Sequence, residues 1–95
     1  MTRYNPYPEF PLVSPEHVQA AFYYSPTSYR LIRRLPQGKA RACAPAEGHA
    51  QVVWDGRRWP LLLLVWLCTH GHWPERRIMR MQGESNRVDN LMEKY

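Results

Sequence analysis

The residue types best suited to metal chemistry gather in one short stretch, Cys68-Thr69-His70-Gly71-His72, and Cys43 adds a further thiol. Zinc prefers sulfur and imidazole nitrogen as ligands. Structural zinc sites, however, repeat paired ligands at regular spacings, and this chain has no second pair. We therefore interpret Cys68 as a core residue and the two histidines as surface residues of a turn, and we expect neither a metal nor another cofactor.

Sequence motifs of the other common site chemistries do not occur. Cys43 has no neighbouring acid or base in the sequence that would activate its thiol as a nucleophile. There is no Gly-x-Ser-x-Gly motif and no glycine-rich phosphate-binding loop. The remaining functional side chains are mainly arginine and tyrosine, which bind ligands rather than react with them.

Arginine supplies most of the positive charge. Lys+Arg number 13 and Asp+Glu 8, a formal net charge of +5, and eleven of the 13 cations are arginine. Arginine pairs bidentately with carboxylates and phosphates and stacks on rings. The densest segment runs from Arg30 to Arg41, with five cations and no acid. Such a segment is typical of a charged, solvated strand edge, and the alternative is a ribbon that faces phosphates.

Aromatic residues divide into an expected core set and an expected surface set. Trp54, Trp59 and Trp66 fall at hairpin and helix positions that are usually buried. The surface set consists of Tyr4, Tyr7, Tyr23, Tyr24 and Tyr95. Tyrosine beside arginine suits a protein interface and base stacking equally. The candidate binding residues are therefore Arg30, Arg33, Arg34, Arg57, Arg58, Arg76, Arg77, Arg80, Arg87, Tyr23 and Tyr24.

These residues need a small α+β domain to position them. We expect an extended Pro- and Tyr-rich arm over residues 1–13 and one domain over residues 14–95. A helix begins at Ser14-Pro15, because serine caps and proline suits the first helical position, and it ends before Ser25-Pro26. The next segments are a strand over Tyr29–Leu35 and a loop over Pro36–Gly48.

The second half of the chain carries the clearest local signals. Asp55-Gly56 between residues 50–54 and 57–59 predicts a β-hairpin with a type I′ turn. Pro60 opens a helix that ends near His70 before Gly71 and is apolar all round, which is typical of a buried helix. We further expect a strand over Ile78–Met81, a turn over Gln82–Glu84 and a last helix capped by Ser85, with Val88, Leu91 and Met92 on one face.

The sequence places the protein in the cytoplasm of a cell rather than in a membrane. The longest apolar run, Trp59–Cys68, is about half of the ~20 residues that a spanning helix needs. The first ten residues do not resemble a signal peptide, and two cysteines are too few for a disulfide scaffold.

Several motifs between Gly48 and Leu91 follow one another in a particular order. They are the hairpin turn Asp55–Trp59, the helix start Leu61–Trp66 with Gly71 and Pro74 behind it, Ile78–Glu84, and Asn86-Arg87-Val88-Asp89-Asn90-Leu91. Upstream, Phe22–Tyr29 is similar to a Tyr-Asp-Pro-Glu-Thr-Gly turn. Together they resemble the small phage and homing-type HNH endonucleases. The resemblance implies an HNH-like (ββα-metal) core with a β-hairpin, a buried helix, an N-terminal helix and the arm.

The catalytic positions of that family are replaced here. Its metal-binding Asp corresponds to Met79, its general-base His to Arg80 and its first-helix His to Leu62. A thioether is a poor ligand for a hard cation, and Arg cannot act as a base near neutral pH. Asn86 and Asn90 are retained, and asparagine at these positions also caps and braces a helix.

The resemblance therefore implies a degenerate nuclease that binds without cutting. We expect a phage or mobile-element protein that inhibits a host nucleic-acid-targeting defence complex, as anti-CRISPR proteins do, so the partner is a host ribonucleoprotein or nuclease complex. The alternatives are a basic DNA-binding accessory protein and, ranked last, a residual metal-dependent nuclease. A further alternative is self-association through a dimer face formed by Met79, Met81 and Met92.

Overall fold

The computed structural model describes residues 5–43 and 50–94. Helix α1 (Pro15–Ala21) begins where predicted, and the Ser14 hydroxyl accepts the backbone N–H of His17 at 3.1 Å. It ends earlier than predicted, because the aromatic residues that follow form strand β1 (Phe22–Tyr24). Aromatic side chains favour a half-buried strand, and here a neighbouring strand is available to pair with them.

Strands β1, β2 (Leu31–Arg34) and β3 (Ala40–Ala42) form an antiparallel sheet in that order. The short 3₁₀ helix η1 (Pro36–Gly38) connects β2 to β3. The predicted strand is thus confirmed. The predicted loop is wrong over Ala40–Ala42, because these residues pair along the free edge of β2. The rest of the predicted loop, residues 44–48, lies outside the described residues.

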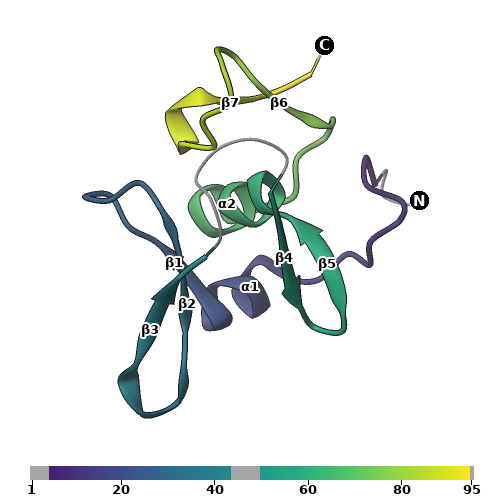
Figure 1. The fold of residues 1–95 in the computed structure, drawn as a ribbon. Coiled ribbons are helices and arrows are strands. Elements are labelled where there is room, and N and C mark those ends of the chain that lie inside the picture. The colour runs from purple at the N-terminus through teal and green to yellow at the C-terminus, as the bar shows by residue number, and fades with distance from the viewer. Residues whose placement is uncertain (1–4, 44–49, 95) are drawn as a thin grey trace.

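The predicted hairpin and buried helix are confirmed. Strands β4 (Gln51–Trp54) and β5 (Arg57–Pro60) are joined by Asp55 and Gly56, both at positive φ (53° and 81°), as a type I′ turn requires. Helix α2 (Leu61–His70) ends at Gly71, which has the left-handed φ of 71°. Six of its residues are buried, and it contacts α1, β1, β2, β5 and the 3₁₀ helix η2 (Val88–Asn90). In Figure 1, α2 lies at the centre of the molecule.

The chain then forms a second pair of antiparallel strands, β6 (Ile78–Arg80) and β7 (Leu91–Glu93). The predicted strand at Ile78 is confirmed, but the predicted last helix is wrong. Residues 88–90 make only the single turn of η2, and Leu91 continues into β7 opposite Arg80. The apolar spacing of Val88 and Leu91 is compatible with a helix and also with a turn followed by a strand. The pairing of Leu91 with Arg80 of β6 favours the turn and strand.

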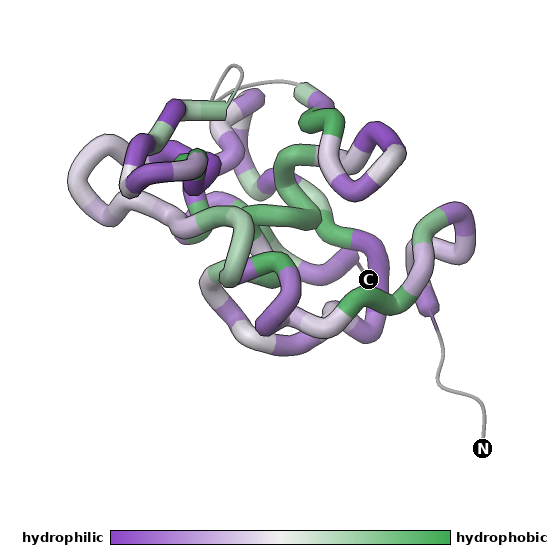
Figure 2. Tube along the Cα trace, turned by 90° about the horizontal axis from the view of Figure 1, so that it is seen from below, coloured by the Kyte–Doolittle hydropathy of each residue, from purple (hydrophilic) through white to green (hydrophobic). Residues whose placement is uncertain are grey.

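One hydrophobic cluster holds these elements together. Its fully buried side chains include Trp59, Phe22, Leu63, Leu64 and Leu67. Hydrophobic segments, green in Figure 2, gather towards the middle of the molecule, and hydrophilic segments dominate the outer loops. The radius of gyration of 12.9 Å is that of a compact chain of this length. The fold is a small single α+β domain, and no helix among its described residues has the length and apolarity to cross a membrane.

Candidate anion-binding site

A pocket of about 610 Å³ opens between α2, the β4–β5 hairpin, the arm and the β6–β7 pair. Apolar side chains of Pro60, Leu62, Ile78 and Met79 form part of its lining. Three cationic residues, Arg77, Arg80 and Lys94, also line it, and no aspartate or glutamate among the described residues does. A pocket with positive charge, an apolar wall and no carboxylate is suited to an anionic group carried by a larger molecule.

The three residues that the HNH resemblance would align with catalytic positions all line this pocket. Leu62 reaches it from α2, and Met79 and Arg80 reach it from β6. Their side chains offer one aliphatic group, one thioether and one guanidinium. Among the described residues, no group of three or more His, Cys, Asp or Glu side chains could hold a metal ion. The side chains at this place can attract an anion, and they provide neither a carboxylate ligand nor a base.

Arg80 is held in a defined orientation. Its Nη1 donates to the Oδ1 atom of Asn86 at 3.0 Å, and Asn86 is 3% exposed. Asn90 holds the turn between β6 and β7 because its Oδ1 accepts from the backbone of Gln82 and its Nδ2 donates to the carbonyls of Gln82 and Ser85. The two asparagines therefore brace an arginine and a turn. The expectation that they cap a helix is wrong, because within the described residues only the single 3₁₀ turn η2 follows Asn86, and its N-cap residue is Arg87, without a side-chain cap.

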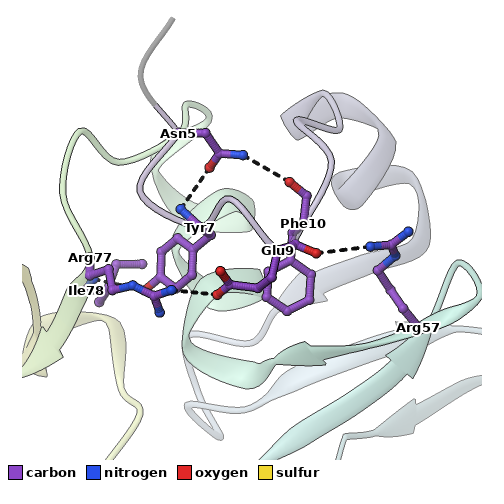
Figure 3. A network of polar contacts seen from close by, with 7 residues as sticks. All are labelled: Asn5, Tyr7, Glu9, Phe10, Arg57, Arg77 and Ile78. Atoms are coloured by element: carbon purple, nitrogen blue, oxygen red, sulfur yellow. Dashed lines mark hydrogen bonds and ion pairs between the residues drawn. The ribbon is translucent and has the colours of Figure 1, made fainter.

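The N-terminal arm forms one wall of the pocket. Tyr7 is 3% exposed, and its hydroxyl accepts the backbone N–H of Ile78 at 3.0 Å (Figure 3). Burial raises the pKa of this phenol above its ordinary value. Asn5 accepts the N–H of Tyr7 and donates to the carbonyl of Phe10, which in turn stacks on Trp59 at 4.7 Å. The expectation that Tyr7 lies on the surface is wrong, because the arm folds back onto its own domain. Tyr4 and Tyr95 lie outside the described residues.

Glu9 of the arm neutralises part of the positive charge at the pocket. Its carboxylate pairs with Arg77 at 2.6 Å, and the Arg77 guanidinium lies 4.5 Å from the ring centre of Tyr7. The backbone carbonyl of Glu9 accepts from Arg57 at 3.2 Å, as Figure 3 shows. A hydrogen bond from its own backbone N–H, and then Arg77, hold the pKa of Glu9 below its ordinary value. The guanidinium of Arg77 is thus already paired with a carboxylate of the same chain.

A second, smaller pocket of about 300 Å³ is lined by β4 and the β2–β3 pair and shares Gln51 with the first. Arg33 and Arg41 line it and are direct partners across the β2–β3 pairing. Like charges directly opposite one another destabilise a sheet. Part of the hydrogen-bonding capacity of Arg33 is used, since its Nη1 donates to the carbonyl of Val53 at 3.0 Å. The two pockets therefore meet at Gln51, and cationic side chains line each of them.

The other candidate arginines and tyrosines line neither of these two pockets, and Arg87 lines a third pocket of about 470 Å³ beside the turn of Gln82 and Ser85. Arg34 donates to the carbonyl of Gln19 and lies 4.9 Å from the ring centre of Tyr23. Arg87 pairs with Asp89 at 3.3 Å and lies 3.6 Å from the ring centre of Tyr29. The half-buried Tyr24 uses its hydroxyl to accept the N–H of Val88. The remaining candidates, Arg30, Arg57, Arg58 and Arg76, are exposed.

Among the pocket residues, the candidate list from the sequence contained Arg33, Arg77 and Arg80 and missed Tyr7, Arg41 and Lys94. Lys94 reaches the pocket because its backbone N–H bonds to the carbonyl of Arg77 beside the β6–β7 pair, which the sequence did not indicate. Comparisons of the chain with protein-family models, with curated proteins and with solved structures found no match.

Proposed function

We propose that this protein is a non-catalytic binding protein that holds an anionic group of a macromolecular partner in the pocket around Arg80. The observation that carries the proposal is the gathering of Leu62, Met79 and Arg80 with two further cations in one pocket, which no Asp or Glu of the described residues lines. An arginine fixed by a buried asparagine is always charged and offers several N–H donors in a rigid plane. Such a group binds phosphate or carboxylate well and cannot accept a proton from water.

The second pocket extends the proposed binding surface. Because Gln51 of β4 lines both pockets, the cations of the first and the Arg33–Arg41 pair of the second belong to adjoining pockets. A partner with several anionic groups could satisfy both sets at once. The unfavourable pairing of Arg33 with Arg41 would then be offset on binding.

The kind of partner follows from the HNH-like pattern. We propose a phage or mobile-element protein that acts in the host cytoplasm by occupying the nucleic-acid-binding surface of a host defence complex, in the manner of anti-CRISPR proteins. A further feature supports the pattern. Tyr29 ends the segment that is similar to the family's Tyr-Asp-Pro-Glu-Thr-Gly turn, and its φ of 56° lies in the region that favours the glycine at that position.

The test is co-elution of the purified protein with a nuclease effector complex in the absence of DNA, followed by an affinity measurement. Arg80→Ala should weaken binding about ten- to hundredfold, since a charged hydrogen bond contributes ~1.5–3 kcal/mol. Arg58→Ala is the matched control, because Arg58 is exposed and lines neither pocket. Equal affinity of the wild type and the Arg80 variant, with a folded variant, would refute the proposal.

The alternative that the charge distribution favours is a basic DNA-binding accessory protein. Binding to duplex or single strands should then weaken steeply with salt, with a log–log slope of about −0.7 to −0.9 for each phosphate neutralised. A gel shift without any complex at low salt would dismiss this alternative. Nicking of a plasmid by the purified protein with Mg²⁺, Mn²⁺ or Zn²⁺ would instead overturn the non-catalytic proposal.

A further inference from the structure

The histidines at the carboxyl end of α2 lie apart from both pockets and have no part in the proposed function. His70 is the last residue of α2, and His72 follows the left-handed Gly71, which turns the chain back after the helix. Both imidazoles are exposed. Cys68, the third potential ligand of this stretch, is half-buried. Among the described residues, no three His, Cys, Asp or Glu side chains lie together as a possible metal site, so Cys68 does not join the two imidazoles.

Hydrogen bonds indicate which nitrogen of each ring is available. The Thr69 hydroxyl has one proton, and it donates that proton to the carbonyl of Val65 at 2.7 Å. It can therefore only accept from Nδ1 of His70, which lies 3.2 Å away. Nδ1 of His72 lies 3.0 Å from the carbonyl of Trp73, which also can only accept. A neutral imidazole with these partners carries its proton on Nδ1 and keeps a lone pair on Nε2 for a ligand.

The separation of the two rings is compatible with a shared ligand. Their centres are 5.9 Å apart and their planes are 78° to each other. A metal ion lies ~2.1 Å from an imidazole nitrogen, so two rings on one ion can have centres up to roughly 6.4 Å apart. The ring of Trp66 stacks under His70 at 3.7 Å with an interplanar angle of 9°, which limits the rotation of His70. Glu93 adds a negative charge near His70.

We propose that His70 and His72 bind one divalent transition-metal ion through Nε2, with water in the remaining coordination positions. An Nδ1–H that donates to a carbonyl or hydroxyl oxygen is the usual second contact of a metal-ligating histidine. Imidazole suits copper, nickel and zinc, and for a given nitrogen site Cu²⁺ binds more tightly than Ni²⁺ or Zn²⁺. With two protein ligands the site should be weaker than a four-ligand structural zinc site.

The experiment is a fluorescence titration of the untagged full chain with CuCl₂, because Cu²⁺ at His70 would lie beside the Trp66 ring and quench it. A background His49→Ala variant removes the histidine that lies outside the described residues. We expect saturable quenching, and at least a tenfold weaker midpoint for His70→Ala and for His72→Ala. His17→Ala is the matched control, because His17 is an exposed histidine that faces Asp55.

Histidine NMR adds a readout that needs no tryptophan. In the metal-free protein both rings should show the Nδ1–H tautomer, and Zn²⁺ should shift Nε2 of both. Cys68→Ala should leave the copper midpoint unchanged. Quenching that does not saturate, that responds equally to His17→Ala, or that disappears in Cys68→Ala but persists in His72→Ala would overturn the proposal. None of these outcomes depends on binding at the Arg80 pocket, so the two proposals fail separately.

Discussion

The two parts of the molecule that face each other across the pocket are stabilised in different ways. In the part formed by α2 and the β4–β5 hairpin, contacts are mostly apolar, and Trp59, Leu63 and Leu64 have no exposed surface. In the β6–β7 part only Ile78 and Leu91 of the strand residues are buried. Side chains there bond to the backbone instead: Asn90 holds the turn before η2, and Glu93 accepts the N–H groups of Glu75 and Arg76.

The difference assigns separate tasks to the two parts. The apolar part supplies the scaffold and the pocket wall at Leu62, while the polar part supplies the cations Arg77, Arg80 and Lys94. Burial is strong but does not depend on direction, whereas hydrogen bonds orient a side chain within a narrow range. A site built on the polar part can therefore change its side chains while the hydrophobic cluster keeps the fold. The predictions that follow probe this contrast.

The largest expected effect is the loss of Trp59. Its ring is fully buried against Phe10 and Trp54, and its Nε1–H donates to the carbonyl of Trp54 at 2.9 Å. Trp59→Ala should lower the free energy of unfolding by about 3–5 kcal/mol, measured by urea denaturation. Val53→Ala on the same hairpin is the control, because Val53 is 63% exposed and should change stability by less than about 0.5 kcal/mol. Similar losses for both variants would contradict the apolar scaffold.

An intermediate effect is expected at Asn90. Asn90→Ala removes three side-chain hydrogen bonds to the backbone of Gln82 and Ser85 and should cost about 1–3 kcal/mol. Hydrogen exchange should show faster opening of β6 and β7 than of α2, because the loss falls on the polar part. Asp89→Ala is the neighbouring control, since its exposed pair with Arg87 contributes ~0–1 kcal/mol. Uniformly faster exchange over both parts would show that they unfold as one unit.

The smallest expected effect is a pH dependence at the contact between the arm and β6. The folded-state pKa of Glu9 lies below its ordinary value of 4.5, so its contribution to stability is present above that pH. It is lost as the pH falls through the folded-state pKa. The difference in melting temperature between the wild type and Glu9→Gln should therefore shrink at pH values below 4.5. Glu84→Gln controls for the loss of one exposed negative charge, and a difference that persists unchanged in acid would contradict the assignment.

The sequence predicted correctly those helix ends and turns that depend on one or two neighbouring residues. Ser14-Pro15 marks the start of α1, Asp55-Gly56 marks the hairpin turn, and Gly71 marks the end of α2, because each depends on the conformational preference or capping ability of one or two residues. Strands β3 and β7 were missed because an edge strand of three residues forms only where a distant partner offers its hydrogen-bonding edge. The burial of Tyr7 depends likewise on Ile78, 71 residues away.

The sequence by itself determined that this protein is a small α+β domain with a hairpin, a buried helix and an excess of arginine, because composition, turn residues and apolar runs act over short distances along the chain. Only the tertiary structure decided which cations share a pocket and which ones stack on tyrosines or pair with Glu9. It also decided that His70 and His72 both use Nδ1 in a hydrogen bond, because that choice depends on the hydroxyl or carbonyl oxygen that lies beside each ring.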